Sequence, residues 1–312
     1  MSDEDLYGLE QVMLKGPYAS HYRRELVTAK SSILERIERA TTSGASERLR
    51  SVFEFSTGEA KELIPVLSVR GDMFNARILL RRFTERDNRS GQPQWHDYGP
   101  LGSFFFDSLW RECVSPMEAV ERCYTSSEPT AIPLAHSLEA FIESSDFMIA
   151  ERCYMSEIIS WSLKPLNGLS PGEDKVREFV GRSVDLWNIQ IWFRKSLSRN
   201  KDIGQHWDYL DGGTITPDIF ERSSSIADLL SDTIWNDSLK LSSRSFPELG
   251  RKLQLDFLKW QIALFRLDIL GIGVAIAYMA RQILEWRNME ILAVGLSANL
   301  APDRIRNLLW RL

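Results

Sequence analysis

The sequence predicts an all-α protein built from three related helical units. Apolar residues recur at intervals of three and four, as in Tyr22, Leu26, Ala29, Ile33 and Ile37, which is the spacing of one face of a helix. The sustained alternation of apolar and polar residues that marks a half-buried strand is absent from the sequence. A short motif centred on an asparagine also recurs three times at nearly equal intervals. These observations together favour a repeated helical architecture.

Four proline-containing sites predict where helices begin. Ser115-Pro116-Met117-Glu118 and Ser170-Pro171-Gly172-Glu173 each combine a capping serine, a proline at the first helical position and a glutamate that can close a capping box. Thr216-Pro217 and Ala301-Pro302-Asp303 are weaker versions of the same signal. Gly271-Ile272-Gly273 is too short a match for a phosphate-binding loop, and we expect it to lie inside an apolar helical stretch, where packing explains the glycines.

The recurring motif places an acidic residue three positions before an asparagine. The pairs are Asp72 and Asn75, Asp185 and Asn188, and Glu285 and Asn288. The asparagines lie 113 (188 − 75) and 100 (288 − 188) residues apart, about one third of the 312-residue chain. This spacing predicts helical repeats at residues 1–105, 106–215 and 216–312, with approximate boundaries.

Two glycine turns support the repeat. Tyr98-Gly99-Pro100-Leu101-Gly102 and Leu210-Asp211-Gly212-Gly213 each follow an asparagine after about 25 residues, at offsets of 27 (102 − 75) and 25 (213 − 188). Each turn leads into another expected helix. We therefore align Gly102 with Gly213.

An asparagine inside a helix needs a local reason, because its amide competes for backbone hydrogen bonds and lowers helix propensity. The structural interpretation is that each amide bonds a neighbouring chain segment, or the acidic residue of the next unit, where helices cross. The functional alternative is that the aspartates and asparagines are metal or substrate ligands. We favour the structural interpretation, also for Asp72, Asp185 and Glu285, because catalytic sites are seldom triplicated with the same residues.

The composition excludes several functional classes. A net charge of −5 and a pI near 5.6 provide no general attraction to nucleic acid or anionic lipid, although a local basic patch remains possible. Cys113, Cys123 and Cys153 are odd in number and lack CxxC spacing, so we expect reduced thiols. The apolar stretch 262–280 contains Arg266 and Asp268 and is too short to span a membrane.

The sequence predicts no catalytic, cofactor-binding or metal-ligating residue. The four histidines are scattered, with no pair at the i, i+4 spacing of a helix-borne metal site: His21, His96, His136 and His206. No serine lies in a Gly-x-Ser-x-Gly elbow. An acid–base enzyme whose carboxylates meet only on folding is an open alternative.

The last third of the chain carries a specific set of spaced residues. They are Tyr278, Glu285, Asn288, Gly295, Pro302, Asp303, Ile305 and Arg306. Their spacing resembles the signature of the C subunit of the archaeal and bacterial V/A-type ATPases, the counterpart of the d subunit of the eukaryotic V-ATPase. In that family a tyrosine precedes a Lys-Glu-x-Glu-x-x-Asn helix, a Gly-Lys run and a Pro-Glu-x-Ile-Arg helix start. The departures indicate a distant branch: Gln282 and Ile283 replace Lys-Glu, Leu296 replaces the lysine and Asn299 replaces a glycine.

The resemblance implies a non-catalytic rotor part. In that family three similar helical bundles form a funnel with approximate threefold symmetry, which sits on the membrane proteolipid ring and receives the base of the central stalk. It implies a cytoplasmic protein, peripheral to the membrane, whose partners are central-stalk subunits and the proteolipid ring, with no nucleic acid and no cofactor. The alternative is a free-standing helical scaffold or adaptor derived from the family. A rotor subunit predicts a central cavity lined by residues from all three repeats, whereas an enzyme predicts a pocket of titratable groups with shifted pKa values.

Overall fold

The computed structural model describes residues 2–27, 31–84, 93–166, 168, 170–197, 208–239 and 246–312. No residue in these ranges forms a strand, so the predicted all-α class is confirmed. The helices are α1 (Ser2–Lys15), α2 (Ala19–Val27), α3 (Ile33–Phe55), α4 (Glu59–Ser68), α5 (Arg70–Thr84), α6 (Gly102–Glu112), α7 (Pro116–Tyr124), α8 (Ala131–Ser144), α9 (Phe147–Leu163), α10 (Pro171–Leu197), α11 (Pro217–Arg222), α12 (Ile226–Leu230), α13 (Asn236–Leu239), α14 (Phe246–Leu267), α15 (Gly273–Ser297) and α16 (Pro302–Leu308).

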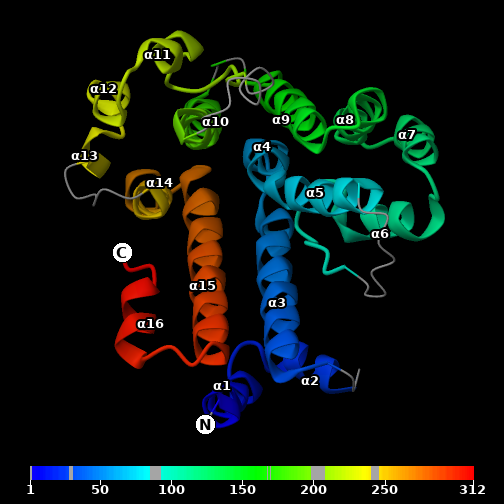
Figure 1. Ribbon diagram of the computed structural model, residues 1–312, viewed down its shortest axis with the longest axis vertical. Coiled ribbons are helices and arrows are strands. Elements are labelled where there is room, and N and C mark those ends of the chain that lie inside the picture. The colour runs from blue at the N-terminus through cyan, green and yellow to red at the C-terminus, as the bar shows by residue number, and fades with distance from the viewer. Residues whose placement is uncertain are drawn as a thin grey trace.

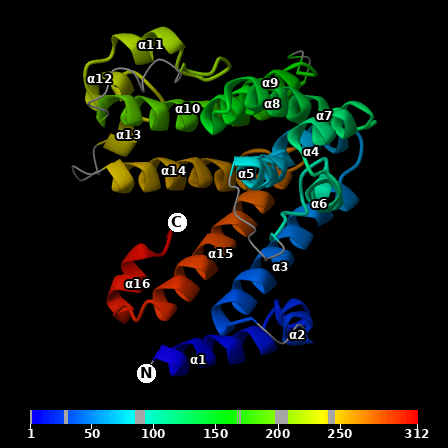
Figure 2. The ribbon, with the colours of Figure 1, turned by 45° about the vertical axis from the view of Figure 1, so that its right-hand side comes forward.

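The long helices α3 and α15 pack side by side and run from the middle of the molecule to one end, where α1 and α2 cross them (Figure 1). Helices α4 to α14 form an arc at the other end, and α16 folds back along α15. Figure 2 shows α14 lying beneath α10, with which it packs. The helices that carry the three asparagines are α5, α10 and α15, and each of them contributes residues to a cavity inside this arrangement.

The expected helix starts are confirmed. Helices α7, α10, α11 and α16 begin at Pro116, Pro171, Pro217 and Pro302. The Ser115 hydroxyl accepts a hydrogen bond from the Glu118 N–H at 3.3 Å, and the Ser170 hydroxyl accepts one from the Glu173 N–H at 3.1 Å. Both bonds satisfy an amide that has no partner inside the helix.

The periodicity of the apolar residues from Tyr22 to Ile37 predicts one helix face, but the structure has two helices here. Helix α2 ends at Val27 and α3 begins at Ile33, while Ala29 lies outside the described residues. Ser32 and Glu35 form a complete capping box at the new start. A local cap therefore outweighs the continuity of the apolar pattern.

Gly271 and Gly273 are expected inside a helix, but they lie at the turn between α14 and α15. Helix α14 ends at Leu267, the chain turns, and α15 begins at Gly273, whose N–H donates to the Asp268 carboxylate at 2.8 Å. A Cβ on Gly273 would lie 2.6 Å from the Cβ of Asp268. The glycines thus permit a tight turn that Asp268 closes, rather than packing inside a helix.

The central apolar core joins segments from distant parts of the sequence. Its buried members include Leu49 of α3, Ile64 of α4, Val180 of α10 and Ile276 of α15. Three further clusters lie among α5 to α9, among α10 to α14, and between α15 and the first three helices. The expected boundary after residue 105 falls inside α6 and the one after residue 215 falls just before α11, so the three-unit division stays a prediction.

Candidate functional site

Each of the three asparagines clamps the backbone of a residue 21 or 22 positions further along the chain. In every case Nδ2 donates to a carbonyl oxygen, and Oδ1 accepts from the N–H of the same residue. The partners are His96 for Asn75 (both 2.8 Å), Leu210 for Asn188 (both 2.8 Å) and Trp310 for Asn288 (3.0 and 2.8 Å). Asn75 and Asn188 are fully buried and Asn288 is half-buried. A two-bond clamp of this kind satisfies both the buried amide and an otherwise unpaired backbone segment.

Two of the acidic residues hold the turn that follows each clamp. A carboxylate oxygen of Asp72 accepts from the Leu101 N–H at 2.9 Å. Asp185 accepts from the Ile215 N–H and from the Trp235 indole N–H, each at 2.9 Å. Burial is the main cause that raises the pKa of Asp72 to about 7, and it also raises the pKa of Asp185. These aspartates therefore have structural partners in the turn.

The glycine turns are shaped by those aspartates. A Cβ on Gly213 would lie 2.6 Å from a carboxylate oxygen of Asp185, and a Cβ on Gly99 would overlap the Asp72 carboxylate. The sequence comparison aligned Gly102 with Gly213. By contact, however, the counterpart of Gly213 is Gly99, because a Cβ on Gly99, but not one on Gly102, would meet the motif aspartate of the same predicted repeat.

Glu285 departs from the pattern of Asp72 and Asp185. Its carboxylate accepts from the Tyr18 hydroxyl at 2.7 Å and lies 3.4 Å from the Arg48 guanidinium. It therefore connects α15 to α3 and to the turn between α1 and α2. The third motif shares the asparagine clamp, but its acidic residue serves a different contact.

The remaining family-signature positions mostly pack α16 against α15. Ile305 is buried, and a Cβ on Gly295 would lie 2.9 Å from the Ile305 side chain. Pro302 starts α16, while Arg306 forms an exposed ion pair with Asp303 on the same helix. Tyr278 lies apart from these residues, on the wall of a groove beside the α14–α15 turn.

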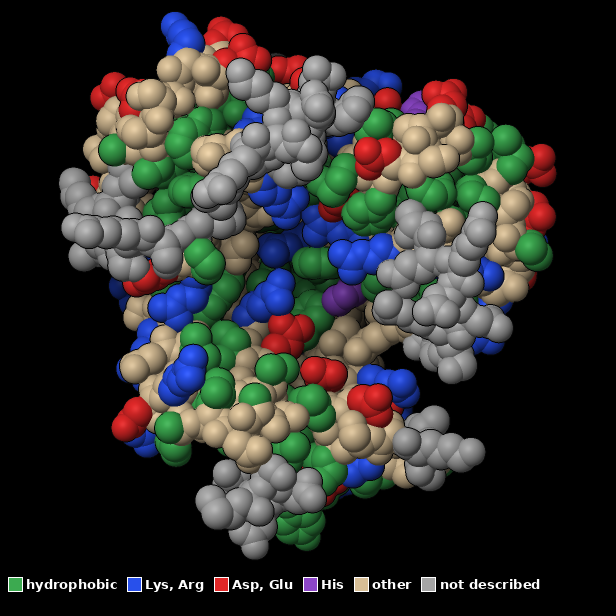
Figure 3. All heavy atoms as spheres, viewed as in Figure 1, with side chains coloured by type: hydrophobic (Ala, Val, Ile, Leu, Met, Phe, Trp, Pro, Cys, Tyr) green, Lys and Arg blue, Asp and Glu red, His purple; other side chains and the backbone are tan. Residues whose placement is uncertain are grey.

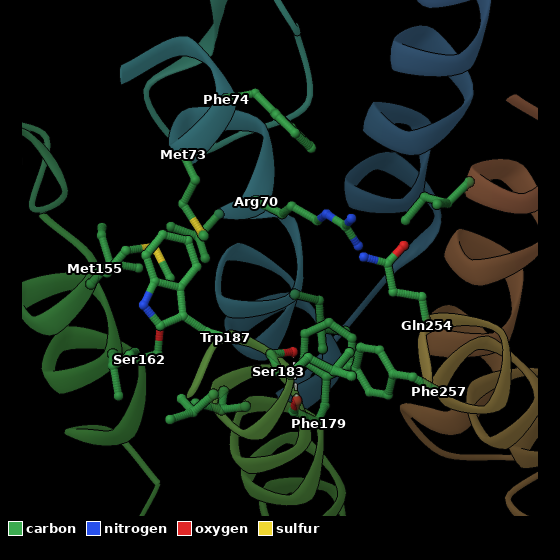
Figure 4. A pocket seen from close by; sticks show the side chains of 18 of the residues that line it. Arg70, Met73, Phe74, Met155, Ser162, Phe179, Ser183, Trp187, Gln254 and Phe257 are labelled. Atoms are coloured by element: carbon green, nitrogen blue, oxygen red, sulfur yellow. Dashed lines mark hydrogen bonds between the residues drawn. The ribbon is translucent and has the colours of Figure 1, made fainter. Parts of the chain in front are cut away.

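A cavity of about 290 Å³ lies where α4, α5, α9, α10, α14 and α15 meet, and Trp310 also lines it (Figure 4). Its lining residues fall within 66–77, 155–162, 179–190, 254–258 and 283–287, together with Trp310, so all three predicted repeats contribute. Most of the wall is apolar, with Trp187 and Phe257 among its aromatic members. The charged side chains among the described lining residues are all arginines: Arg70, Arg77 and Arg287.

Two of these arginines have carboxylate partners and the third has none among the described residues. Arg77 forms an ion pair with Glu151, and Arg287 lies 2.9 Å from Glu290. No such pair involves Arg70, whose side chain extends into the cavity toward Gln254 (Figure 4). Lys and Arg side chains gather around the hollow at the centre of this face (Figure 3). The cavity therefore carries positive charge in a chain whose net charge is −5.

Burial and the positive charge of the cavity lower the pKa values of Arg70 and His96. Burial lowers the pKa of Arg70, and the positive charges of Arg287 and Arg77 lower it further. The same two causes, burial first and then Arg287 and Arg70, lower the pKa of His96 to about 4, so this imidazole is neutral at pH 7. An arginine stays protonated in a protein, so Arg70 carries its charge into the cavity.

This basic cavity has almost no signature in the sequence. Arg70 and Arg77 lie seven residues apart (77 − 70), two helical turns, and this spacing is the one local signal that they share a face. Arg287 comes from the far end of the chain. In the part of the chain that the structure describes, no group of three or more His, Cys, Asp or Glu residues could hold a metal ion. Nor is any described helix both long enough and apolar enough to pass through a bilayer.

Comparison with known proteins gives consistent matches. A family model described as ATP synthase (C/AC39) subunit matches residues 17–308. Two relatives from two strains of Thermus thermophilus, each named as the C subunit of a V-type ATP synthase, are 23% identical to this chain over 261 residues. Those residues cover 82% of this chain and 76% of each relative.

Proposed function

The chain belongs to the ATP synthase (C/AC39) subunit family, and on that basis we propose that it is a non-catalytic rotor subunit of a V/A-type rotary ATPase. In this role it couples the central stalk to the membrane proteolipid ring. Torque passes through it during ion transport or ATP synthesis, and no bond is made or broken on the protein itself. It works at the cytoplasmic surface of the membrane, held there by the complex.

The observation that carries this proposal is the cavity walled by all three predicted repeats. A part that transmits rotation needs a seat near its own axis, and a pocket shared by three related units supplies one. Its lining residues come from each of the three predicted repeats, so no single one of them could form it alone. We assign this cavity as the seat for the base of the central stalk.

Stiffness is the second physical requirement, and the clamps supply it. Each asparagine fixes a turn to a long helix through two hydrogen bonds, and two of these asparagines are fully buried. A fully satisfied buried polar contact makes a local structure rigid and specific. One of the clamped residues, Trp310, lines the cavity, and its clamp to Asn288 of α15 holds that part of the wall in place.

A second surface has the character of an interface. Leu267, Ile269 and Leu270, at the turn between α14 and α15, are strongly exposed, and Phe55 is also exposed. Phe55 and Leu270 line the same groove as Tyr278. Exposed apolar clusters of this kind commonly mark protein contacts. We assign this turn to the contact with the proteolipid ring.

The second candidate function is a helical scaffold that has left the rotary complex. The observation in its favour is the loss of the family's Lys-Glu pair at Gln282 and Ile283. Gln282 accepts a hydrogen bond from Arg48, and Ile283 lines the cavity. Both replacements therefore serve contacts within the chain.

Affinity purification separates the two candidates. The tagged protein is recovered from gently solubilised membranes of its own host, and mass spectrometry identifies what accompanies it. Recovery of proteolipid and central-stalk subunits in steady proportion supports the rotor function. Recovery from the soluble fraction alone, without those subunits, refutes it and leaves the scaffold.

A further inference from the structure

We propose that the cavity receives an acidic tip: a partner segment whose aspartate or glutamate pairs with Arg70 while its apolar neighbours pack against the aromatic wall. This inference rests on the proposed rotor function and specifies the chemistry of the segment that enters the seat. The occupant is a protein segment of the central stalk.

Charge complementarity is the first argument for an acidic occupant. Three arginines line the cavity and no described lining residue is acidic. Glu151 offsets Arg77 and Glu290 offsets Arg287, which leaves the charge of Arg70 without a counter-charge among the described residues. A desolvated cation gains most from a carboxylate that arrives with the partner, because the attraction is stronger where water is excluded.

The position of Arg70 leaves its guanidinium open to a partner. Arg70 is the first residue of α5, just after the end of α4. Its guanidinium carbon lies 5.5 Å from the Phe74 ring centre, a cation–π distance, and an arginine in such a contact can still present N–H groups to a carboxylate. The Gln254 side chain extends from α14 toward the same point (Figure 4) and offers an amide beside it.

The size and lining of the cavity limit the occupant to a few side chains. A volume of about 290 Å³ corresponds to roughly ten waters at about 30 Å³ each. That is enough for the end of a helix or a loop, and too little for a folded domain. Met73, Met155 and Trp187 cluster on one side of the cavity, and Phe179 and Phe257 on another (Figure 4). An apolar residue next to the carboxylate therefore finds a matching surface.

Photo-crosslinking identifies the occupant directly. The full chain is made with p-benzoylphenylalanine in place of Phe74, which is half-buried on the cavity wall. It is mixed with the purified central-stalk subunits of the same host, irradiated and digested, and the linked peptide is sequenced by mass spectrometry. We expect a stalk peptide with an Asp or Glu within about one helical turn of the linked residue.

Binding measurements test the role of Arg70. Affinity of the chain for the same stalk subunits is measured for wild type, Arg70→Gln, Arg70→Lys and the control Arg222→Gln. Arg222 lies exposed on α11, away from the cavity lining, and its guanidinium donates to a carbonyl on its own helix. Losing one partner of a buried charge pair commonly costs 2–5 kcal/mol, so Arg70→Gln should weaken binding at least about thirtyfold. Arg70→Lys should recover part of the loss, and Arg222→Gln should bind like wild type.

The outcomes separate this inference from the proposed function. Failure of the wild-type chain to bind the stalk subunits overturns the rotor function and the acidic tip with it. Normal binding by Arg70→Gln, or a linked stalk peptide without a nearby acid, overturns the acidic tip alone. If Arg70→Gln is not folded by circular dichroism, the crosslinked peptide and Arg70→Lys decide the question.

Discussion

Replacing Asn188 by alanine should destabilise the protein more than any exposed asparagine substitution. Asn188 is fully buried, and it forms two hydrogen bonds of 2.8 Å with the backbone of Leu210, which is itself 2% exposed. Removing the amide deletes both bonds. It also leaves a buried N–H and a buried C=O at Leu210 without partners.

The expected magnitude follows from those two losses. Each hydrogen bond contributes about 1 kcal/mol net, and each buried backbone group left unpaired costs about 1–3 kcal/mol. Partial relaxation of the turn recovers some of this, so we expect a loss of about 3–5 kcal/mol in the free energy of unfolding. At Asn288, which is half-buried like its partner Trp310, water can replace the lost bonds, and about 1 kcal/mol is expected.

Urea unfolding followed by circular dichroism measures the loss, and amide hydrogen exchange at residue 210 localises it. Asn307→Ala, an exposed site on α16, is the matched control. Asn188→Asp keeps the size of the side chain and the acceptor for the Leu210 N–H but sets a carboxylate against the Leu210 carbonyl. It should therefore destabilise at pH 7 at least as much as alanine does. If Asn188→Ala and Asn307→Ala lose equal stability, and exchange at residue 210 is unchanged, the clamp is not a source of stability.

Two further predictions concern the turns beside the clamps. Burial raises the folded-state pKa of Asp72 from 3.8 to about 7. Between these two values the folded state keeps a proton that the unfolded state releases. The contribution of Asp72 to stability therefore falls as pH rises from about 4 to about 7. From about pH 4 to about pH 7 the urea midpoint of wild type should therefore fall relative to that of Asp72→Asn. A difference that stays constant across this range would contradict the raised pKa of Asp72. Gly213→Ala should cost about 1–3 kcal/mol in thermal or urea unfolding, because its Cβ would lie 2.6 Å from an Asp185 oxygen. Gly250→Ala, in α14 with nothing within 4 Å, should instead stabilise by about 0.5–1 kcal/mol, and equal effects at the two glycines would refute the steric explanation.

Much of the secondary structure could be predicted because its signals are local. A capping serine contacts an amide three residues away, as at Ser115 and Ser170, so the start of each helix is encoded within one turn of sequence. The same locality explains the error at Tyr22 to Ile37. There the capping box at Ser32 starts a new helix inside a continuous apolar pattern.

The recurring asparagine motif was visible in the sequence, but its contacts could only partly be predicted. The three asparagines occupy equivalent positions in the motif. Each amide bonds the backbone of another chain segment, which is one of the two kinds of partner expected for it. The third acidic residue could not be assigned from spacing. Glu285 bonds to Tyr18, 267 residues away along the chain, and no motif in the sequence links the two.

The helical class and the four proline-led helix starts could be read from the amino-acid order, because each rests on contacts within a turn or two of one helix. The asparagine motif could be read because the same residue types recur at the same short spacing. Folding in three dimensions was needed to show which backbone each asparagine clamps, that Gly99 rather than Gly102 matches Gly213, and that arginines meet in a central cavity. Arg70 and Arg287 are 217 residues apart (287 − 70). What brings them together is the packing of α5 against its neighbours and of α15 against α3 and α14, and those helix crossings depend on many side chains at once.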